Sequence, residues 1–242
     1  MTLNIIGIGL GDEKDITLKG LDLVKKSDIV YLENYTSKLN CDISKLENLY
    51  GKKLILANRD LVENKTEIID NSIKKEVSFL IIGDVFGATT HIDIVQRARE
   101  KKIKVNIVHN TSILNAIGET GLSLYNFGKK TSIPFANKNV VSPIKVYEEN
   151  LKLGLHTLFL LDLKPDEDKF MSVNEAIEYI LRNKVDENKM AVACCAIGSD
   201  KQIIKYGKLK DLKSKKFDAY PQCLIIPGKM HFMEEEFLEF YK

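Results

Sequence analysis

Short apolar runs alternate with amphipathic segments through the first half of the chain. Uninterrupted apolar runs predict buried strands, and apolar residues that recur every three or four positions predict helices packed on one face. Strands that alternate with helices are typical of an α/β domain with a largely parallel sheet. The predicted strands are residues 3–8, 29–32, 54–57, 79–82 and 105–108, and the predicted helices are residues 17–26, 62–75 and 92–102.

The second half of the chain has a different order of elements. Its last predicted strands are not separated by a strong helix, which favours a mixed or antiparallel sheet. A polar region around residues 113–126 is expected to link the halves. We therefore predict two α/β domains, residues 1–110 and 111–242, with a cleft between them. The predicted strands here are residues 157–161, 190–197, 202–206 and 223–226, and the predicted helices are residues 173–182 and 234–241.

The charge balance gives no global reason to expect a nucleic-acid or membrane partner. The 242 residues include 36 Lys and Arg and 34 Asp and Glu, for a formal net charge of +2. No apolar run approaches the roughly 18 residues that span a bilayer, and the N-terminus does not resemble a signal peptide. The four cysteines form no C-x-x-C pair. Reduced thiols in a cytoplasmic protein are expected, with Cys194 and Cys195 packed in a strand.

A glycine-rich loop, GIGLGD at residues 7–12, follows the first predicted strand. Its G-x-G-x-G spacing differs from the dinucleotide pattern G-x-G-x-x-G. Asp12, Glu13 and Asp15 follow at once, and these carboxylates would repel a pyrophosphate at the start of the next helix. The loop therefore suits a neutral or cationic ligand, or it is only a tight turn with a helix cap.

Two further polar segments follow predicted strands: GDVFGATTH at residues 83–91 and HNTSI at residues 109–113. Strand ends of this kind face the ligand crevice of an open α/β sheet. Asp84 is placed to accept hydrogen bonds from ribose hydroxyls or an ammonium group. The second segment has a structural alternative, because Thr111 or Ser112 can cap a helix. Three such loops together favour a shared pocket.

The remaining polar residues of GDVFGATTH have structural interpretations. Thr89 or Thr90 is expected to cap the next helix, and with Thr90 as the cap Asp93 occupies the third helical position. His91 would lie in the first helical turn, where a neutral imidazole is common and need not be catalytic.

The histidines give no metal signature. His91, His109, His156 and His231 are widely spaced, and none forms a recognised zinc pair. No G-x-S-x-G turn is present, which argues against a serine hydrolase of that type. We predict no metal site.

Five segments, in order along nearly the whole chain, resemble the diphthine synthase family of the tetrapyrrole-methylase-like class of S-adenosylmethionine methyltransferases. The GIGLGD loop with its following T-L-K is shared across the wider class, whereas ATTH and HN-x-S-I are much more specific to diphthine synthases. The segments are GIGLGDEKDITLKGLDLVKKSDIVYLENYTS, GDVFGATTH, HNTSILNAIGETGLSLYNFGKKTSIPF, HTLFLLDLK and LIIPGKMHFMEEEFL.

The resemblance implies two α/β domains, usually as a homodimer, with S-adenosyl-L-methionine folded in the cleft between them. One departure lies near residues 195–199, where Ala196 stands at a position that is usually arginine in the family. No catalytic residue is assigned. The cofactor contacts carried over onto matching positions are Leu10, Asp84, Gly87, Ser112, Ile113, Leu163 and His231.

The resemblance also implies the reaction. Relatives methylate repeatedly the amino group of the modified histidine of translation elongation factor 2 during diphthamide biosynthesis, with S-adenosyl-L-homocysteine as product. Eukaryotic relatives also esterify the carboxylate. His91 or His109 can serve as a base only if it reaches the acceptor amine. The alternatives are a methyltransferase acting on a corrin or porphyrin ring, and a scaffold that binds the translation factor without turnover.

Overall fold

The computed structural model describes residues 1–242, and the chain divides into two compact units. The first unit comprises Met1–Leu114 with Lys164–Glu167, and the second comprises Asn115–Leu163 with Asp168–Lys242. The boundary expected after residue 110 therefore lies slightly too early, and the return of residues 164–167 to the first unit was not predicted. No helix has both the length and the apolar character needed to cross a membrane.

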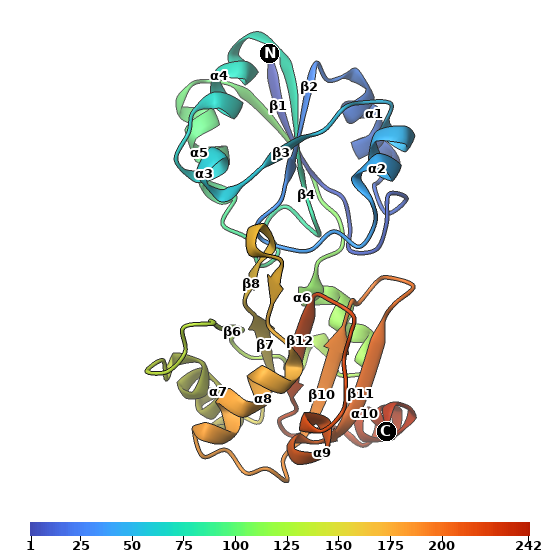
Figure 1. Cartoon of the computed structure of the whole chain (residues 1–242), viewed down its shortest axis with the longest axis vertical. Coiled ribbons are helices and arrows are strands. Elements are labelled where there is room, and N and C mark those ends of the chain that lie inside the picture. Colours follow the sequence, from blue (N-terminus) through green and yellow to red (C-terminus); the bar gives the residue numbers. More distant parts are fainter. The chain divides into compact units, whose positions relative to one another are not determined.

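The first unit is a five-stranded parallel sheet with helices on both faces (Figure 1). The strand order is β3-β2-β4-β1-β5, with β1 at Thr2–Gly7, β2 at Ile29–Glu33, β3 at Ile55–Ala57, β4 at Glu76–Ile81 and β5 at Lys104–Val108. Helices α1 (Leu18–Lys26) and α2 (Ile43–Tyr50) cover one face, and α3 (Arg59–Glu63), α4 (Glu67–Lys74) and α5 (Ile92–Glu100) cover the other.

Successive side chains of β1 pack on opposite faces of the sheet. Leu3 and Ile5 pack in the core under α3–α5, whereas Ile6 packs in the core under α1 and α2. Because both faces are covered, apolar residues follow one another along the strand, which is the pattern of a buried parallel sheet. This explains why β1, β2 and β4 could be predicted from their apolar runs. Strands β3 and β5 were also predicted, although most of their residues are not buried.

The single helix predicted at residues 62–75 is wrong. The backbone forms α3 and α4 with a break between Glu63 and Glu67. The amides of Asn64 and Lys65 both donate to the carbonyl of Asp60, which ends α3. The apolar pairs 61–62 and 68–69 flank the break and are seven positions apart. This spacing equals about two helical turns, so the sequence pattern is that of one continuous helix.

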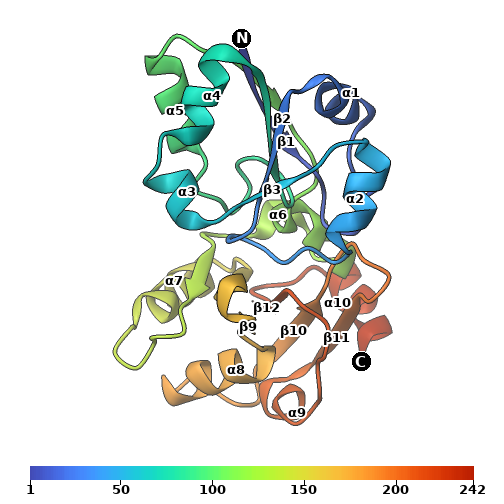
Figure 2. The same cartoon turned by 45° about the horizontal axis from the view of Figure 1, so that its top comes forward.

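The second unit contains a mixed sheet, as the sequence predicted. Its order is β11-β10-β12-β7-β6; β6 and β7 are parallel, and the other neighbours are antiparallel. Helices α7 (Ser142–Lys152), α8 (Val173–Arg182) and α9 (Leu209–Lys213) pack together over one face (Figure 2). The strands are β6 (Thr131–Ile133), β7 (Thr157–Leu161), β10 (Met190–Cys195), β11 (Ile203–Lys208) and β12 (Gln222–Ile226).

The smaller elements complete the chain. Strands β8 (Leu163–Lys164) and β9 (Lys169–Phe170) pair as a short ribbon. Helix α6 (Ile113–Ala116) begins the predicted link, and α10 (Phe232–Leu238) lies near the C-terminus. Both Cys194 and Cys195 are buried as free thiols in β10, which confirms their predicted packing role.

Candidate cofactor-binding site

Three loops meet where β4, β1 and β5 end, because these strands are neighbours in one parallel sheet. They are the GIGLGD loop, the GDVFGATTH loop and the HNTSI loop. Gly9 and Gly83 join the first two: the Gly9 amide donates to the Gly83 carbonyl at 3.2 Å, and the Gly83 amide donates back at 2.8 Å. Both residues have left-handed backbone conformations, with φ of 81° and 90°, which glycine adopts without strain.

Asp84 connects the second loop to the third. Its Oδ1 accepts from the Phe86 amide at 2.9 Å, and its Oδ2 accepts from His109 Nδ1 at 2.9 Å and from the Asn110 amide at 3.0 Å. Burial acts to raise the pKa of Asp84, but these hydrogen bonds outweigh it and hold the pKa below its ordinary value of 3.8. Asp84 is therefore a carboxylate at neutral pH.

Asn110 ties the third loop to the first. Its side-chain amide donates to the carbonyls of Gly7 and Asp15, at 3.0 and 2.9 Å. The Asp15 carboxylate in turn accepts from the Gly11 amide at 2.7 Å. One of the three carboxylates that were expected to repel a pyrophosphate is therefore hydrogen-bonded within the loop. The cap of α1 is Thr17, whose hydroxyl accepts from an amide of the first turn.

Gly87 and Ser112 are in close contact across the loops. A Cβ added at Gly87 would lie 2.4 Å from Ser112 Cβ and 2.5 Å from its Oγ. Ser112 Oγ accepts from the Leu114 amide at 3.0 Å and starts the helix that begins at Ile113. Ser112, rather than Thr111, therefore has the capping role.

The structure brings five of the seven predicted contact residues to one edge of the first unit. Leu10 belongs to this group, because its Cδ2 lies 3.5 Å from the position of a Cβ built on Gly83. The other two lie in the second unit on separate elements. Leu163 begins β8, and its amide donates to Asp162 Oδ1 at 2.9 Å. His231 is the N-cap of α10, which places it in a turn.

A buried His–Glu pair, which sequence reasoning missed, holds the turn that contains His231. Glu234 Oε2 accepts from the His231 amide at 2.7 Å, and Oε1 accepts from the Ser123 amide at 2.7 Å. His156 Nε2 lies 3.2 Å from Glu234 Oε1, while His156 Nδ1 accepts from the Gly228 amide. Burial acts to raise the pKa of Glu234, but these hydrogen bonds lower it overall. The His231–Glu234 spacing is that of a capping box, with histidine in place of the usual serine or threonine.

The predicted threonine cap of α5 is wrong. The N-cap position is His91, and its side chain makes no capping hydrogen bond. The hydroxyl of Thr89 donates to the Val85 carbonyl at 2.7 Å, and that of Thr90 donates to Glu63 Oε1 at 3.3 Å. Thr89 therefore closes a hydrogen bond within the loop, whereas Thr90 ties the loop to α3.

His91 is the most buried polar residue of its loop, with 1% of its surface exposed. Its Nε2 lies 3.3 Å from the Tyr35 hydroxyl, and the rings of Tyr35 and Phe79 meet it edge-on. Burial lowers the pKa of His91 to about 4. The ring is therefore neutral at physiological pH and is not exposed to a substrate in this conformation.

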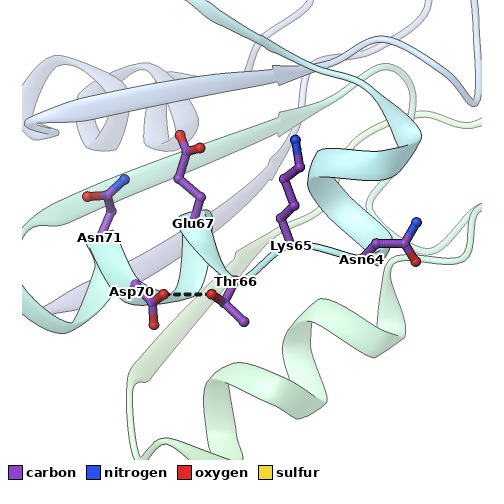
Figure 3. Close-up of a pocket in the computed structure, with 6 residues that line it drawn as sticks. All are labelled: Asn64, Lys65, Thr66, Glu67, Asp70 and Asn71. Atoms are coloured by element: carbon purple, nitrogen blue, oxygen red, sulfur yellow. Dashed lines mark hydrogen bonds between the residues drawn. The ribbon is translucent and has the colours of Figure 1, made fainter.

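A separate hollow of about 490 Å³ lies at the break between α3 and α4 (Figure 3). Inside it the Thr66 hydroxyl donates to Asp70 Oδ2 at 2.7 Å. The acidic residues of the first turn stabilise the start of α4. None of the predicted contact residues lines this hollow, whose lining residues are Asn64, Lys65, Thr66, Glu67, Asp70 and Asn71.

Comparisons with known proteins identify the family. The family model described as Tetrapyrrole (Corrin/Porphyrin) Methylases matches residues 2–213. A diphthine synthase from Methanococcus maripaludis is 43% identical over 98% of each chain. A diphthine methyl ester synthase from Dictyostelium discoideum is 42% identical over 100% of this chain and 98% of its own. A crystal structure of diphthine synthase matches with a TM-score of 0.93 and 34% identity, covering 100% of this chain and 96% of the other. The chain therefore belongs to the diphthine synthase family and is an S-adenosylmethionine-dependent methyltransferase of the tetrapyrrole methylase class.

Proposed function

We propose that this chain repeatedly methylates the amino group of the modified histidine of translation elongation factor 2, as a step of diphthamide biosynthesis. The observation that carries the proposal is full-length similarity to relatives named diphthine synthase and diphthine methyl ester synthase. The acceptor would be the amine of a 3-amino-3-carboxypropyl arm on that histidine. Relatives with both names match this chain at similar identity, so the number of methyl groups, three or four, is left to measurement.

The cofactor contacts of the first unit fit S-adenosyl-L-methionine chemically. A carboxylate offers about four acceptor positions, and three donors already occupy Asp84. One position remains for a ribose hydroxyl or for the ammonium group. The negative charge of Asp84 also suits a cofactor whose sulfonium and ammonium groups are cationic.

The apolar and small residues complete this part of the proposed site. Ser112 fills the space that a side chain at Gly87 would need, so the glycine lets these two loops of the proposed site pack closely. Leu10 and Ile113 would supply apolar walls and main-chain groups. Leu163 and His231 of the second unit remain part of the proposal on the strength of the family resemblance.

The chain's task in this chemistry is alignment and the exclusion of water. The bound cofactor supplies an activated methyl group, so no residue has to activate the donor. Holding the acceptor amine in line with that methyl group converts a reaction between two molecules into one within a complex. We further propose a cytoplasmic homodimer whose protein partner is elongation factor 2, with no nucleic acid involved.

Calorimetry with S-adenosyl-L-methionine tests the assignment of Asp84. The change Asp84→Ala removes a buried acceptor and is expected to weaken cofactor binding by about 1–3 kcal/mol, the usual cost of a lost hydrogen bond in such a site. Equal affinity of the two proteins would contradict a contact between Asp84 and the cofactor.

A transfer assay with labelled methyl donor tests the acceptor. Elongation factor 2 that carries the 3-amino-3-carboxypropyl arm is expected to become labelled, whereas factor without the arm is not. A corrin and a porphyrin serve as the competing acceptors. Label on the ring compounds but not on the factor would favour the tetrapyrrole alternative, and cofactor-independent binding of the factor would favour a scaffold.

A further inference from the structure

His109 and Asp84 form an imidazole–carboxylate pair at the edge where the three loops meet. His109 Nδ1 lies 2.9 Å from Asp84 Oδ2. The Asp84 side chain is 15% exposed and that of His109 is 66% exposed. The carboxylate is thus held inside the loops while most of the imidazole faces outward. The two residues are 25 positions apart in sequence, on loops that follow β4 and β5.

The carboxylate determines which ring nitrogen carries the proton. Because Asp84 is ionised, Nδ1 of a neutral His109 keeps its hydrogen and donates it to Oδ2. The lone pair is then on Nε2, on the opposite side of the ring. The Phe86 ring packs edge-on against the imidazole, with centroids 5.9 Å apart, and carries no charge. Asp84 is the charged group that faces His109.

The other three histidines do not present a free ring-nitrogen lone pair beside an orienting carboxylate at an exposed position. His91 is buried against Tyr35 and Phe79. His156 is fully buried, with both ring nitrogens engaged by the chain. His231 uses Nδ1 to accept from an amide of α10. His109 combines exposure with an orienting carboxylate, which is the arrangement that keeps an imidazole ready to accept a proton.

We propose that His109 is the general base of the methyl transfer and that Asp84 is its positioning residue. The inference rests on the proposed function, because it needs an amine as acceptor. An amine is mostly protonated at neutral pH and must lose a proton before it can attack. His109 Nε2 takes that proton and then releases it to water from the exposed side of the ring.

Each methyl transfer replaces one N–H bond of the acceptor with one N–C bond. One N–H bond of the acceptor breaks, its proton bonds to Nε2, and its electron pair stays on the acceptor nitrogen. That pair forms the new N–C bond to the methyl group. The S–C bond breaks, and its electrons remain on the sulfur as a thioether. His109 returns to its neutral form when water takes the proton, so it serves again for the next methyl group.

The variant His109→Gln tests the base. Glutamine can still donate a hydrogen bond toward Asp84 but cannot take up a proton. We expect kcat on arm-bearing elongation factor 2 to fall by about 10²-fold at pH 7, the lower end of the usual contribution of a general base. Calorimetric affinity for S-adenosyl-L-methionine should stay close to wild type. An unchanged kcat, or a loss of activity explained by lost cofactor affinity, would overturn the inference.

Chemical rescue separates a base from a structural role. In His109→Ala, added imidazole is expected to restore part of kcat, and the deficit should shrink as pH rises, because hydroxide and solvent then deprotonate the amine. His91→Ala is the matched control: its defect comes from the core, so imidazole should not restore it. Failure of both imidazole and high pH to restore His109→Ala would contradict the proposal. The methylation activity of the wild-type protein is measured first. A wild-type protein that does not methylate the factor would contradict the proposed function and not only the role of His109.

Discussion

Lowering the pH should destabilise the chain through His91. Burial lowers the pKa of His91 from 6.5 to about 4 in the folded protein. Between these two values the unfolded chain binds a proton that the folded chain does not. Stability therefore falls as pH drops through this window and levels off below about pH 4. Above the window His91 is neutral in both the folded and the unfolded chain, so it does not contribute to the pH dependence of stability.

The size of the effect follows from the gap between the two pKa values. One pKa unit corresponds to about 1.4 kcal/mol, and the change between pH 7 and pH 5 integrates to about 2 kcal/mol. Protonation in the folded state would place a charge beside Tyr35 and Phe79, where no carboxylate hydrogen-bonds the ring. The nearby charged residues are Arg59, which lies over the Tyr35 ring, and Glu63, which accepts from Thr90. A substitution at His91 leaves both of them unchanged.

Urea unfolding of wild type and His91→Leu, followed by circular dichroism at pH 7 and pH 5, measures this contribution. Leucine fills much of the same space and does not titrate, so every other titrating group cancels in the comparison. The stability of wild type relative to the variant is expected to drop by about 2 kcal/mol between the two pH values. A difference that stays constant with pH would refute the reasoning, because His91 would then titrate alike in both states.

Two further substitutions test the packing of the loops. Gly87→Ala places a methyl group against Ser112 and is expected to cost about 1–3 kcal/mol of unfolding free energy, with weaker cofactor binding. The control Gly207→Ala meets its nearest atom only at 3.7 Å, so equal melting points of the two variants would contradict the clash. Glu234→Gln removes a carboxylate that accepts from the His156 ring and is expected to cost about 1–3 kcal/mol. An unchanged urea midpoint would count against that role.

The parts of the fold that sequence could predict are those that depend on local burial. The strands β1 and β4 are buried along their length, so their apolar runs were visible without any knowledge of their partners. Helix α8 was also predicted with the bounds that the structure shows, and the structure adds a Ser172–Glu175 capping box at its start. The break between α3 and α4 was missed, since it depends on how residues 64 and 65 turn back to one carbonyl.

The site was predictable only in part for a similar reason. That the loops after β1, β4 and β5 meet follows from the carboxyl ends of parallel strands lying at one edge. Which side chains bond across those loops does not follow from sequence. Asp84 and His109 are far apart in the chain, and His156 and Glu234 are farther still. The interpretation of the threonines as caps failed because their hydroxyls found partners outside the helix.

Mass spectrometry of elongation factor 2 tests the central claim most directly. The factor carrying the 3-amino-3-carboxypropyl arm would be incubated with this protein and S-adenosyl-L-methionine, then digested and fragmented. Successive methyl additions that map to the arm on the modified histidine are expected, together with formation of S-adenosyl-L-homocysteine. A factor whose mass does not change, with protein that demonstrably binds the cofactor, would contradict it.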